Sequence, residues 1–265
     1  MGMIRVLDVN QKTLEMFGAQ SKGELTHNLD KIFRGEMRAH FHKELTDLWS
    51  GKLSHEAEGI NYTIGGEPLH IQLHLSVFPG YEQTFGRVLV AIEDITARRK
   101  AEEYLRYLGT HDVMTGLYNR SYYEEEMKRL GGGRQYPISI IIADMDGLKD
   151  VNDHLGHQAG DNLIRRAAEV LKAGFRQEDV IARIGGDEFA VIMPVTEKPT
   201  AEEAMERVQT LISLNNKFYG DPALAISLGV STGQKGSALE VIMRAADDDM
   251  YREKRAHHQQ IGKAS

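Results

Sequence analysis

Residues 138–150 decide the fold of the second half of this chain, and they read Ile-Ser-Ile-Ile-Ile-Ala-Asp-Met-Asp-Gly-Leu-Lys-Asp. The first six are apolar except for one serine, which is typical of a strand buried on both faces. Asp144 and Asp146 follow where this strand ends, and in open α/β sheets binding sites lie beyond the carboxyl ends of strands. Gly147 lets backbone amides approach a phosphate and Lys149 adds a positive charge. The segment therefore predicts a site for a magnesium–triphosphate complex.

An EF-hand calcium loop is the alternative explanation for these acids. Such a loop needs an oxygen ligand at its fifth position, glycine at the sixth and glutamate at the twelfth. Counted from Asp144, these positions hold Leu148, Lys149 and Leu155. The calcium loop is therefore excluded.

A second polar cluster lies at residues 183–189, which read Arg-Ile-Gly-Gly-Asp-Glu-Phe. Strand-like segments, Val180–Ile184 and Phe189–Met193, flank the two glycines, which predicts a tight hairpin with two acids at its tip. Taken alone, the run fits an ordinary surface hairpin equally well. Together with Asp144 at the end of the neighbouring strand, it indicates a shared metal site.

The rest of the second half alternates between helical and strand patterns. Helices are predicted at Tyr122–Leu130, Asn162–Leu171, Ala201–Leu214 and Leu239–Arg255, and a further strand at Ala225–Val230, with a frayed tail after His257. This alternation predicts an α/β fold whose central sheet is covered by helices.

The first segment, up to about Thr96, has a different pattern. Helices are predicted at Val9–Phe17 and Met37–Trp49, and strands at Ile60–Ile64, Leu69–Phe78 and Arg87–Glu93, the first two joined by a two-residue hairpin at Gly65-Gly66. Small helices followed by an antiparallel sheet predict an α+β domain.

A charged helix is predicted over residues 97–109, between the two halves. Ala101, Tyr104, Leu105 and Leu108 form a narrow apolar stripe at helical spacing. Such a seam between two domains favours a two-stranded coiled coil, and a helix packed on its own domain is the alternative.

Composition excludes several classes of function. The chain has 265 residues, enough for about two domains, with 32 basic and 39 acidic residues and a net charge of −7. This balance, without a long basic block, argues against binding to duplex nucleic acid. The absence of cysteine excludes disulfides, thiolate metal sites and cysteine catalysis.

The same composition bears on location. No run of about 18 apolar residues predicts a membrane span, and the first ten residues lack the pattern of a signal peptide. We therefore expect a cytoplasmic protein, and a cytoplasmic part of a larger membrane receptor is an equally consistent reading.

The motifs of the second half together resemble the GGDEF family of diguanylate cyclases. Gly185-Gly186-Asp187-Glu188-Phe189 is the signature of this family, and the resemblance extends over about residues 110–254. Further matches are the opening segment 111–120, with Met114 where leucine is usual, the nucleotide segment 144–153, Gly156-His157, Gly160-Asp161, Ala246-Asp247 and the closing run 250–254.

The resemblance implies which residues act on GTP. Asp144, the carbonyl of Met145 and Asp187 would hold Mg²⁺, with Mn²⁺ as an alternative. Asp187 or Glu188 would help to deprotonate the attacking 3′-hydroxyl, and Lys149 would act beside them. The remaining GTP-binding residues would be Gly147, Leu148, Asn152, His157, Asp161, Gly185, Gly186 and Lys254, of which Asn152 and Asp161 read the guanine edge and His157 is equally well structural.

The implied reaction joins two GTP molecules into cyclic di-GMP with release of pyrophosphate. Each domain would hold one nucleotide, so a homodimer would be required for catalysis. Cyclic di-GMP would also inhibit the enzyme at Arg176 and Asp179, which have the spacing and offset of the family's product-inhibition site, and a solvated loop is the alternative reading of that pair. His258 stands where the family usually has a phosphate-binding arginine, and histidine lacks the two-pronged geometry of that side chain.

The first segment resembles a PAS sensor domain, on Val9-Asn10, Leu69–Phe78, Val88–Ile92 and the ending 94–99. The resulting organisation is a PAS-like α+β domain at 1–96, a helical signalling linker at 97–109, a GGDEF α/β domain at 110–256 and a tail at 257–265. His40 and His42 are candidate haem ligands, but surface histidines are the commoner case. The PAS ligand stays unidentified. A catalytically inactive nucleotide receptor and a dimerising scaffold are the alternatives to a PAS-regulated cyclase.

Overall fold

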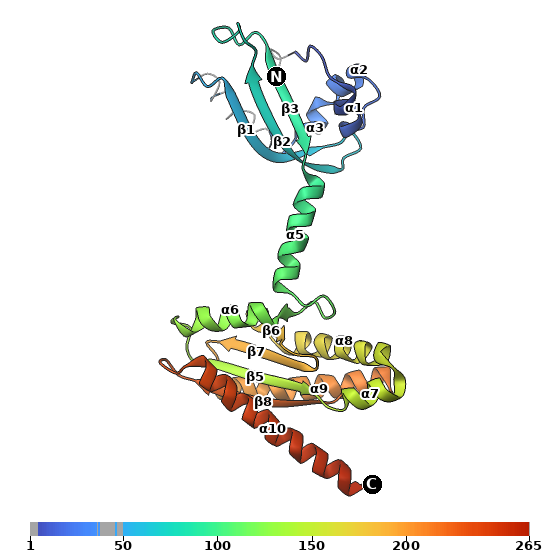
Figure 1. Cartoon of the computed structure of the whole chain (residues 1–265), viewed down its shortest axis with the longest axis vertical. Coiled ribbons are helices and arrows are strands. Elements are labelled where there is room, and N and C mark those ends of the chain that lie inside the picture. Colours follow the sequence, from blue (N-terminus) through green and yellow to red (C-terminus); the bar gives the residue numbers. More distant parts are fainter. Residues whose placement is uncertain (1–4, 36, 38–45, 47–49, 265) are drawn as a thin grey trace. The chain divides into compact units, whose positions relative to one another are not determined.

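A computed structural model of the chain describes residues 5–35, 37, 46 and 50–264. The chain divides into two compact units, Met1–Tyr104 and Leu105–Ser265. Figure 1 labels the elements of each unit, which are described separately below.

The first unit contains three short helices and an antiparallel sheet. The helices are α1 (Gln11–Phe17), α2 (Lys22–His27) and α3 (Leu29–Ile32), and the strands are β1 (Ser54–Tyr62), β2 (Pro68–Val77) and β3 (Val88–Asp94), in the order β1-β2-β3. The predicted α+β class is confirmed. The first helix begins two residues later than predicted, because the side chain of Asn10 accepts the backbone N–H of Thr13 and caps it there.

The turn between β1 and β2 differs from the prediction. β1 ends at Tyr62 and β2 begins at Pro68, so five residues connect the two strands instead of the two predicted. The cause is Ile64, whose N–H donates to the carbonyl of Phe17 and whose side chain packs on the small helical cluster. The predicted helix Met37–Trp49, with His40 and His42, falls mostly outside the described residues.

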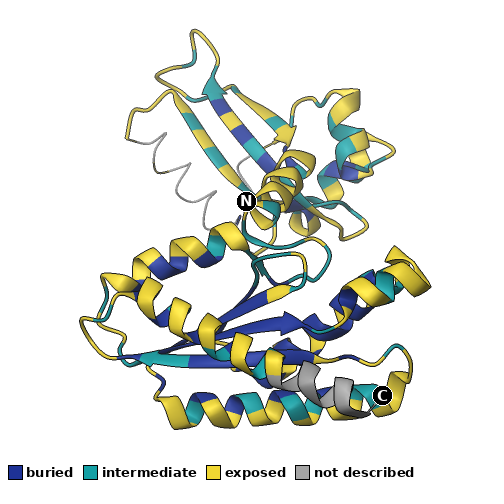
Figure 2. Ribbon diagram, turned by 60° about the horizontal axis from the view of Figure 1, so that its bottom comes forward, coloured by how far each residue is buried: buried dark blue, intermediate teal, exposed yellow. Residues whose placement is uncertain are grey.

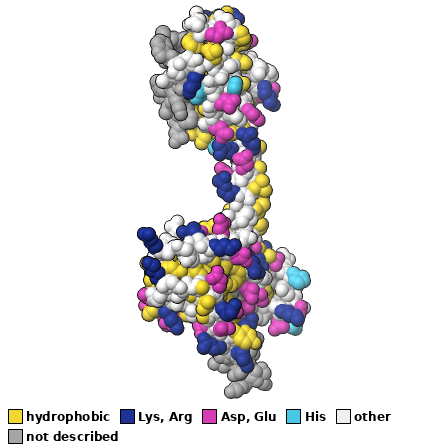
Figure 3. Space-filling model, turned by 60° about the vertical axis from the view of Figure 1, so that its left-hand side comes forward, with side chains coloured by type: hydrophobic (Ala, Val, Ile, Leu, Met, Phe, Trp, Pro, Cys, Tyr) yellow, Lys and Arg dark blue, Asp and Glu magenta, His cyan; other side chains and the backbone are white. Residues whose placement is uncertain are grey.

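The helix predicted at 97–109 is present as α5 (Thr96–Thr110). The carboxylate of Asp94 accepts the N–H of Thr96 at its start. None of its side chains is buried, and Tyr104 and Leu105 are 58% and 66% exposed. Figure 3 shows hydrophobic side chains along one side of this helix.

The second unit is a five-stranded sheet covered by helices. Its elements are β4 (Tyr118–Asn119), α6 (Arg120–Gly131), β5 (Ile138–Met145), α7 (Leu148–Leu155), α8 (His157–Gly174), β6 (Val180–Arg183), β7 (Glu188–Pro194), α9 (Lys198–Tyr219), β8 (Ile226–Gly233) and α10 (Leu239–Ala264). The strand order is β4-β6-β7-β5-β8. In Figure 2 the strands are buried and the outward faces of the helices are exposed. The predicted layered α/β architecture is confirmed.

All eight residues of β5 are buried, as the isoleucine-rich run predicts. Ile141 and Ala143 contribute to the core formed with α8 and α9, whereas Ile140 and Ile142 contribute to the core formed with α6 and α10. The site was predicted from a rule for open parallel sheets, but the strands of this sheet run mostly antiparallel. β5 runs antiparallel to both β7 and β8, and only β4 and β6 are parallel.

In the second unit, α7 and α10 differ most from the sequence prediction. The polar segment read only as a nucleotide loop forms α7, with Leu148, Val151 and Leu155 at helical spacing. The last helix continues to Ala264 instead of ending at Arg255 with a frayed tail, since this segment contains no proline and its single glycine comes late. The side chains of His257 and His258 lie outside the described residues.

Candidate active site

The glycine-rich loop lies beside the end of β5. The N–H of Met145 donates to the carbonyl of Asp187 at 3.0 Å. In such an antiparallel pair, the N–H and C=O groups of one residue both face the partner strand. The carbonyl of Met145 therefore faces the glycine-rich loop as well. The loop is closed by the N–H groups of Ile184 and Gly185, which donate to the carbonyl of Glu188 at 2.9 and 3.2 Å. Asp187 is therefore positioned by backbone bonds next to the last residues of β5.

Lys254 reaches this point from α10. Its ammonium group donates to the carboxylate of Asp144, and only 8% of this residue is exposed. Burial raises the pKa of Asp144, and the charges of Asp187 and Asp146 raise it further, against the opposing effect of Lys254. Burial alone would lower the pKa of Lys254, but its bond to Asp144 and the three carboxylates raise it. Asp146 and Asp187 thus lie close enough to act on the pKa values of Asp144 and Lys254, and the four groups form one electrostatic cluster.

The cluster fits a cation bound partly by substrate. Among the described residues, no three His, Asp or Glu side chains form a ready metal-binding group. Mg²⁺ is usually bound by one or two carboxylates together with substrate phosphates. Asp144 and Asp187 supply the carboxylates, and acids outnumber the single ammonium group here. The site therefore suits a divalent cation that arrives with a phosphorylated ligand.

Ser227 is a site residue that sequence reasoning missed. It is fully buried on β8, and its hydroxyl donates to both carboxylate oxygens of Asp146 at 3.0 and 2.9 Å. The N–H of Asp146 also donates to the carbonyl of Ala225 at 2.9 Å. These bonds fix Asp146 beside Asp144. No motif in the sequence marks this serine.

Gly147 makes the turn between β5 and α7. Its φ of 73° lies in the left-handed region that favours glycine, and it forms the N-terminal cap of α7. The first backbone N–H groups of α7 follow directly, and Lys149 is exposed on its first turn. This arrangement provides backbone donors and one ammonium group beyond the end of β5.

The residues expected to read guanine lie where α7 meets α8. Asn152 is near the end of α7, and Asp161 lies in the first turns of α8. A Cβ on Gly160 would be 2.0 Å from Oδ1 of Asn152, and the three nearest heavy atoms all belong to that side chain. The carboxamide of Asn152 therefore rests on the bare backbone of Gly160, one residue from Asp161. His157 is exposed at the start of α8.

Arg183 is a second site residue that was missed. Its guanidinium donates to the carbonyl of Gly186 at 2.7 and 3.2 Å and to the carboxylate of Asp112 at 3.3 Å, and it contacts the sulfur of Met114 at 3.4 Å. Although burial opposes it, the hydroxyl of Thr115 and the charge of Arg183 lower the pKa of Asp112. Arg183 thus fixes the glycine-rich loop to the opening segment of the unit.

Asp179 forms part of a closed turn between α8 and β6. It is only 6% exposed, and its carboxylate accepts the backbone N–H of Arg176 at 2.9 Å. Burial raises the pKa of Asp179, while this bond and the nearby arginines oppose the shift. Arg176 itself is exposed, so its side chain can meet a ligand at the surface.

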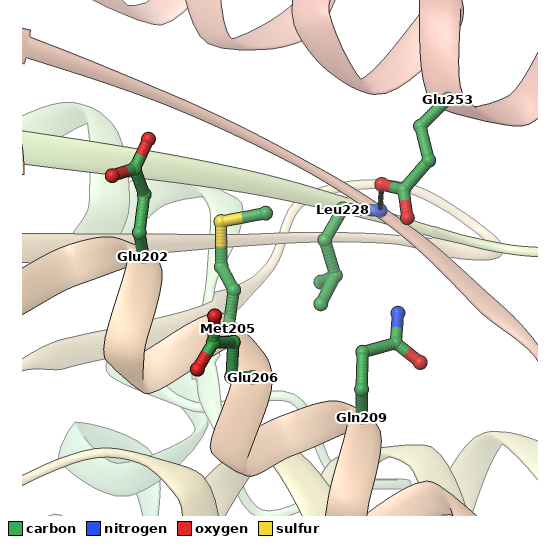
Figure 4. Close-up of a pocket in the computed structure, with 6 residues that line it drawn as sticks. All are labelled: Glu202, Met205, Glu206, Gln209, Leu228 and Glu253. Atoms are coloured by element: carbon green, nitrogen blue, oxygen red, sulfur yellow. Dashed lines mark hydrogen bonds between the residues drawn. The ribbon is translucent and has the colours of Figure 1, made fainter. Parts of the chain in front are cut away.

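A groove lies apart from these residues, between α9, β8 and α10 (Figure 4). Glu253 accepts the N–H of Leu228 at 2.8 Å, and Gln209 donates to the carbonyl of Ile226 at 3.3 Å. Asp249 accepts the N–H of Val230 at 3.1 Å. These bonds cap the outer edge of β8. The other lining residues are Glu202, Met205 and Glu206.

No helix in the described part of the chain combines the length and apolar composition needed to cross a membrane.

Comparisons with known protein families match both units. The profile of the GGDEF domain of diguanylate cyclases matches residues 109–260, and a PAS domain profile matches residues 2–97. Among curated proteins, diguanylate cyclase DgcM of Escherichia coli K12 is 29% identical over 188 residues, which cover 68% of this chain and 45% of DgcM. The probable diguanylate cyclase DgcC of the same strain is 33% identical over 206 residues, which cover 76% of this chain and 55% of DgcC. The chain thus spans about half of the length of these two relatives.

A solved structure has a similar fold over part of this chain. The coiled coil and GGDEF domain of DgcB from Caulobacter crescentus, in complex with c-di-GMP, aligns with a TM-score of 0.56 and 28% identity. The alignment covers 61% of this chain and 89% of that structure.

Proposed function

The chain belongs to the GGDEF family of diguanylate cyclases and carries a PAS domain before its GGDEF domain, and from this premise we propose that it condenses two GTP molecules into cyclic di-GMP. The observation that carries the proposal is the meeting of Asp144, Asp187 and Lys254 at the carboxyl end of β5. Carboxylates that can share a cation with phosphates, next to an ammonium group, suit transfer of a nucleotidyl group.

Each half-reaction makes one bond and breaks one bond. The 3′-oxygen of one GTP attacks the α-phosphorus of the other, the bond to the bridging oxygen breaks, and pyrophosphate leaves. The hydroxyl proton passes to Asp187 or Glu188, and a second round closes the ring. Mg²⁺, when held by Asp144, Asp187 and the carbonyl of Met145, would neutralise developing charge and lower the pKa of the hydroxyl.

The chain's own groups would orient the nucleotide. The backbone of Gly147 and Leu148 would hold phosphates together with Lys149 and Lys254. Asn152 and Asp161 would pair with guanine, and the carboxylate of Asp161 would disfavour adenine, which lacks the matching pair of donors.

Catalysis requires two copies, because one unit has a single set of these residues and the reaction joins two nucleotides. The exposed side chains of Tyr104 and Leu105 on α5 support a coiled coil between two copies. In this proposal, the state of the PAS domain changes the crossing of the paired helices and thereby the alignment of the two GTP molecules. GTP as the substrate and the lack of cysteine favour action in the cytoplasm.

Product inhibition is proposed at Arg176 and Asp179. The exposed guanidinium of Arg176 can stack on guanine and donate to its acceptor edge. The buried carboxylate of Asp179 shapes the turn from which Arg176 extends.

The test is the conversion of GTP by the purified chain with Mg²⁺, followed by chromatography. Asp187→Ala should abolish formation of cyclic di-GMP, whereas Glu203→Ala, which removes an exposed carboxylate of α9, should leave it unchanged. GTP that binds but is not converted at any protein concentration would indicate a receptor. Equal product from Asp187→Ala and the parent chain would refute the assigned chemistry.

A further inference from the structure

Arg166 of α8 is a charged residue in the interior of the second unit. Only 8% of it is exposed, and among the described residues no carboxylate pairs with it. Burial lowers the pKa of its guanidinium, and the phenol of Tyr219, whose ring centroid lies 4.7 Å from the guanidinium carbon, opposes this shift. Arginine is almost never fully buried without a partner charge, and a well-packed apolar residue often stabilises a fold as well. The groups that Arg166 holds by hydrogen bonds therefore explain its presence better than packing does.

Three hydrogen bonds join Arg166 to neutral acceptors around the end of α9. Its Nε donates to Oδ1 of Asn215 at 2.8 Å, and Nη2 donates to Oδ1 of Asn216 at 3.1 Å. Its Nη1 donates to the carbonyl of Pro222 at 2.7 Å. The guanidinium therefore connects α8 both to the last turns of α9 and to the segment that follows this helix.

Asn216 extends this connection to Leu224. Its Nδ2 donates to the carbonyl of Leu224 and its Oδ1 accepts the N–H of Leu224, both at 2.7 Å. The same Oδ1 accepts from Arg166, so one side-chain oxygen joins the guanidinium to the backbone of the segment 222–225. Arg166 thus holds this segment directly at Pro222 and through Asn216 at Leu224.

The segment ends at the proposed active site. The carbonyl of Ala225 accepts the N–H of Asp146 at 2.9 Å, and the hydroxyl of Ser227, near the start of β8, donates to the carboxylate of Asp146. Both bonds come from the stretch of chain that directly follows Leu224. A displacement of this stretch therefore moves Asp146, and with it the turn at Gly147 that would hold phosphates.

We propose that Arg166 is a positioning residue of the active site, which sets the place of Asp146 through the segment 222–225. The charge of Asp146 reaches both Asp144 and Lys254, so its place affects the field around a bound cation. The effect on catalysis rests on the proposed cyclase function. The link between Arg166 and Asp146 can be measured without turnover, so the two can fail separately.

Amide hydrogen exchange of the full chain, resolved by NMR, measures the link directly. The N–H of Asp146 reports its bond to Ala225, and that of Ile141, in the buried middle of β5, reports unfolding of the unit. Arg166→Met should raise the exchange rate of Asp146 at least about tenfold relative to that of Ile141. Arg165→Met is the matched control, because it removes the same charge from the exposed neighbouring position, and it should leave both rates unchanged. An unchanged relative rate in Arg166→Met would refute the link.

The two asparagines of α9 separate positioning from a merely structural role. Both accept a bond from Arg166, but only Asn216 continues to Leu224. Asn216→Ala should therefore raise the relative exchange rate of Asp146 as Arg166→Met does, whereas Asn215→Ala should leave it unchanged. Equal effects of the two asparagine variants would mean that Arg166 only stabilises the fold, and would overturn the proposal.

Steady-state formation of cyclic di-GMP measures the consequence for the reaction. Arg166→Met should lower kcat roughly 5- to 50-fold, because a misplacement of about 1 Å can cost up to about 100-fold even from far away. The KM for GTP should change less than about twofold, because none of these bonds reaches the residues proposed to bind guanine. Arg166→Lys keeps the charge but not the fork of donors, so it should show the same split and replaces Arg166→Met if that variant does not fold.

The kinetic outcomes distinguish this inference from the proposed function. Faster exchange of Asp146 with an unchanged kcat would overturn the role of Arg166 in catalysis. A parent chain that forms no cyclic di-GMP would refute the proposed function, and the exchange rates would still decide whether Arg166 positions Asp146.

Discussion

The contact between Gly160 and Asn152 allows the proposed guanine site to be disturbed without damage to the fold. An alanine Cβ at position 160 would lie 2.0 Å from Oδ1 of Asn152, and ordinary contact begins at 3.4 Å. The carboxamide must therefore retreat by about 1.4 Å, which is enough to break a hydrogen bond to a ligand. The three heavy atoms nearest to the added methyl group all belong to this one flexible side chain.

The expected magnitudes separate binding from stability. Loss of one hydrogen bond to GTP costs ~0.5–1.5 kcal/mol, which corresponds to a roughly 2- to 12-fold rise in KM. The value of kcat should stay unchanged, because Asn152 would contact the base and not the reacting phosphorus. In the helix itself, glycine is less favourable than alanine by about 0.5–1 kcal/mol. The free energy of unfolding should therefore stay the same or rise slightly.

A double-mutant cycle provides the decisive assay. Formation of cyclic di-GMP is measured at varied GTP for Gly160→Ala, Asn152→Ala and the double variant, and urea unfolding is measured for each. If Gly160→Ala acts through Asn152, it should add no further effect in the Asn152→Ala background. An unchanged KM in Gly160→Ala, or fully additive effects in the double variant, would refute the assigned role of Asn152.

Three further predictions concern the support of the site. Gly229→Ala places a Cβ 2.0 Å from the backbone nitrogen of Met250, which cannot move independently of α10; urea unfolding should show a loss of about 1–3 kcal/mol or more. The lowered pKa of Asp112 means that its hydrogen bonds from Thr115 and its ion pair with Arg183 stabilise the fold above the ordinary carboxyl pKa, and this contribution is lost as the pH falls through the lower folded value. Asp112→Asn should therefore be less stable than the parent near neutral pH and should lose less stability than the parent on acidification below about pH 4 in chemical unfolding. Ser227→Ala removes the hydroxyl that donates to the carboxylate of Asp146, and steady-state assays should show a roughly 3- to 10-fold lower kcat/KM from the lost bond, whereas unchanged kinetics would make Ser227 merely structural.

Patterns that depend on neighbouring residues were predictable from the sequence. The apolar run of β5 gave its burial, and the spacing of apolar residues gave most helices of the second unit. The direction of the strands was not predictable in this way, because a strand buried on both faces has the same composition in parallel and antiparallel sheets. The helix α7 was missed because its residues also fit a nucleotide loop, and a short segment with three apolar residues gives a weak helical signal.

Contacts between distant parts of the chain were less accessible. The bond between Asp146 and Ser227 joins residues 81 positions apart, and that between Asp112 and Arg183 joins residues 71 apart. Neither serine nor an isolated arginine carries a local signal of such a role. These partners become recognisable only when the strand register is known, since Asp144 pairs with Ser227 across β5 and β8.

The position of Lys254 depends on the way in which α10 is attached to the sheet. Asp249 and Glu253, one helical turn apart, accept the outward N–H groups of Val230 and Leu228, and Gly229 between them leaves room for the helix backbone. Both the rotation and the distance of α10 are thereby fixed at the strand next to β5. Lys254 follows Glu253 directly, so the bonds that cap the edge of β8 also set where its ammonium group meets Asp144. An edge that would otherwise be open to another strand thus positions a group of the proposed active site.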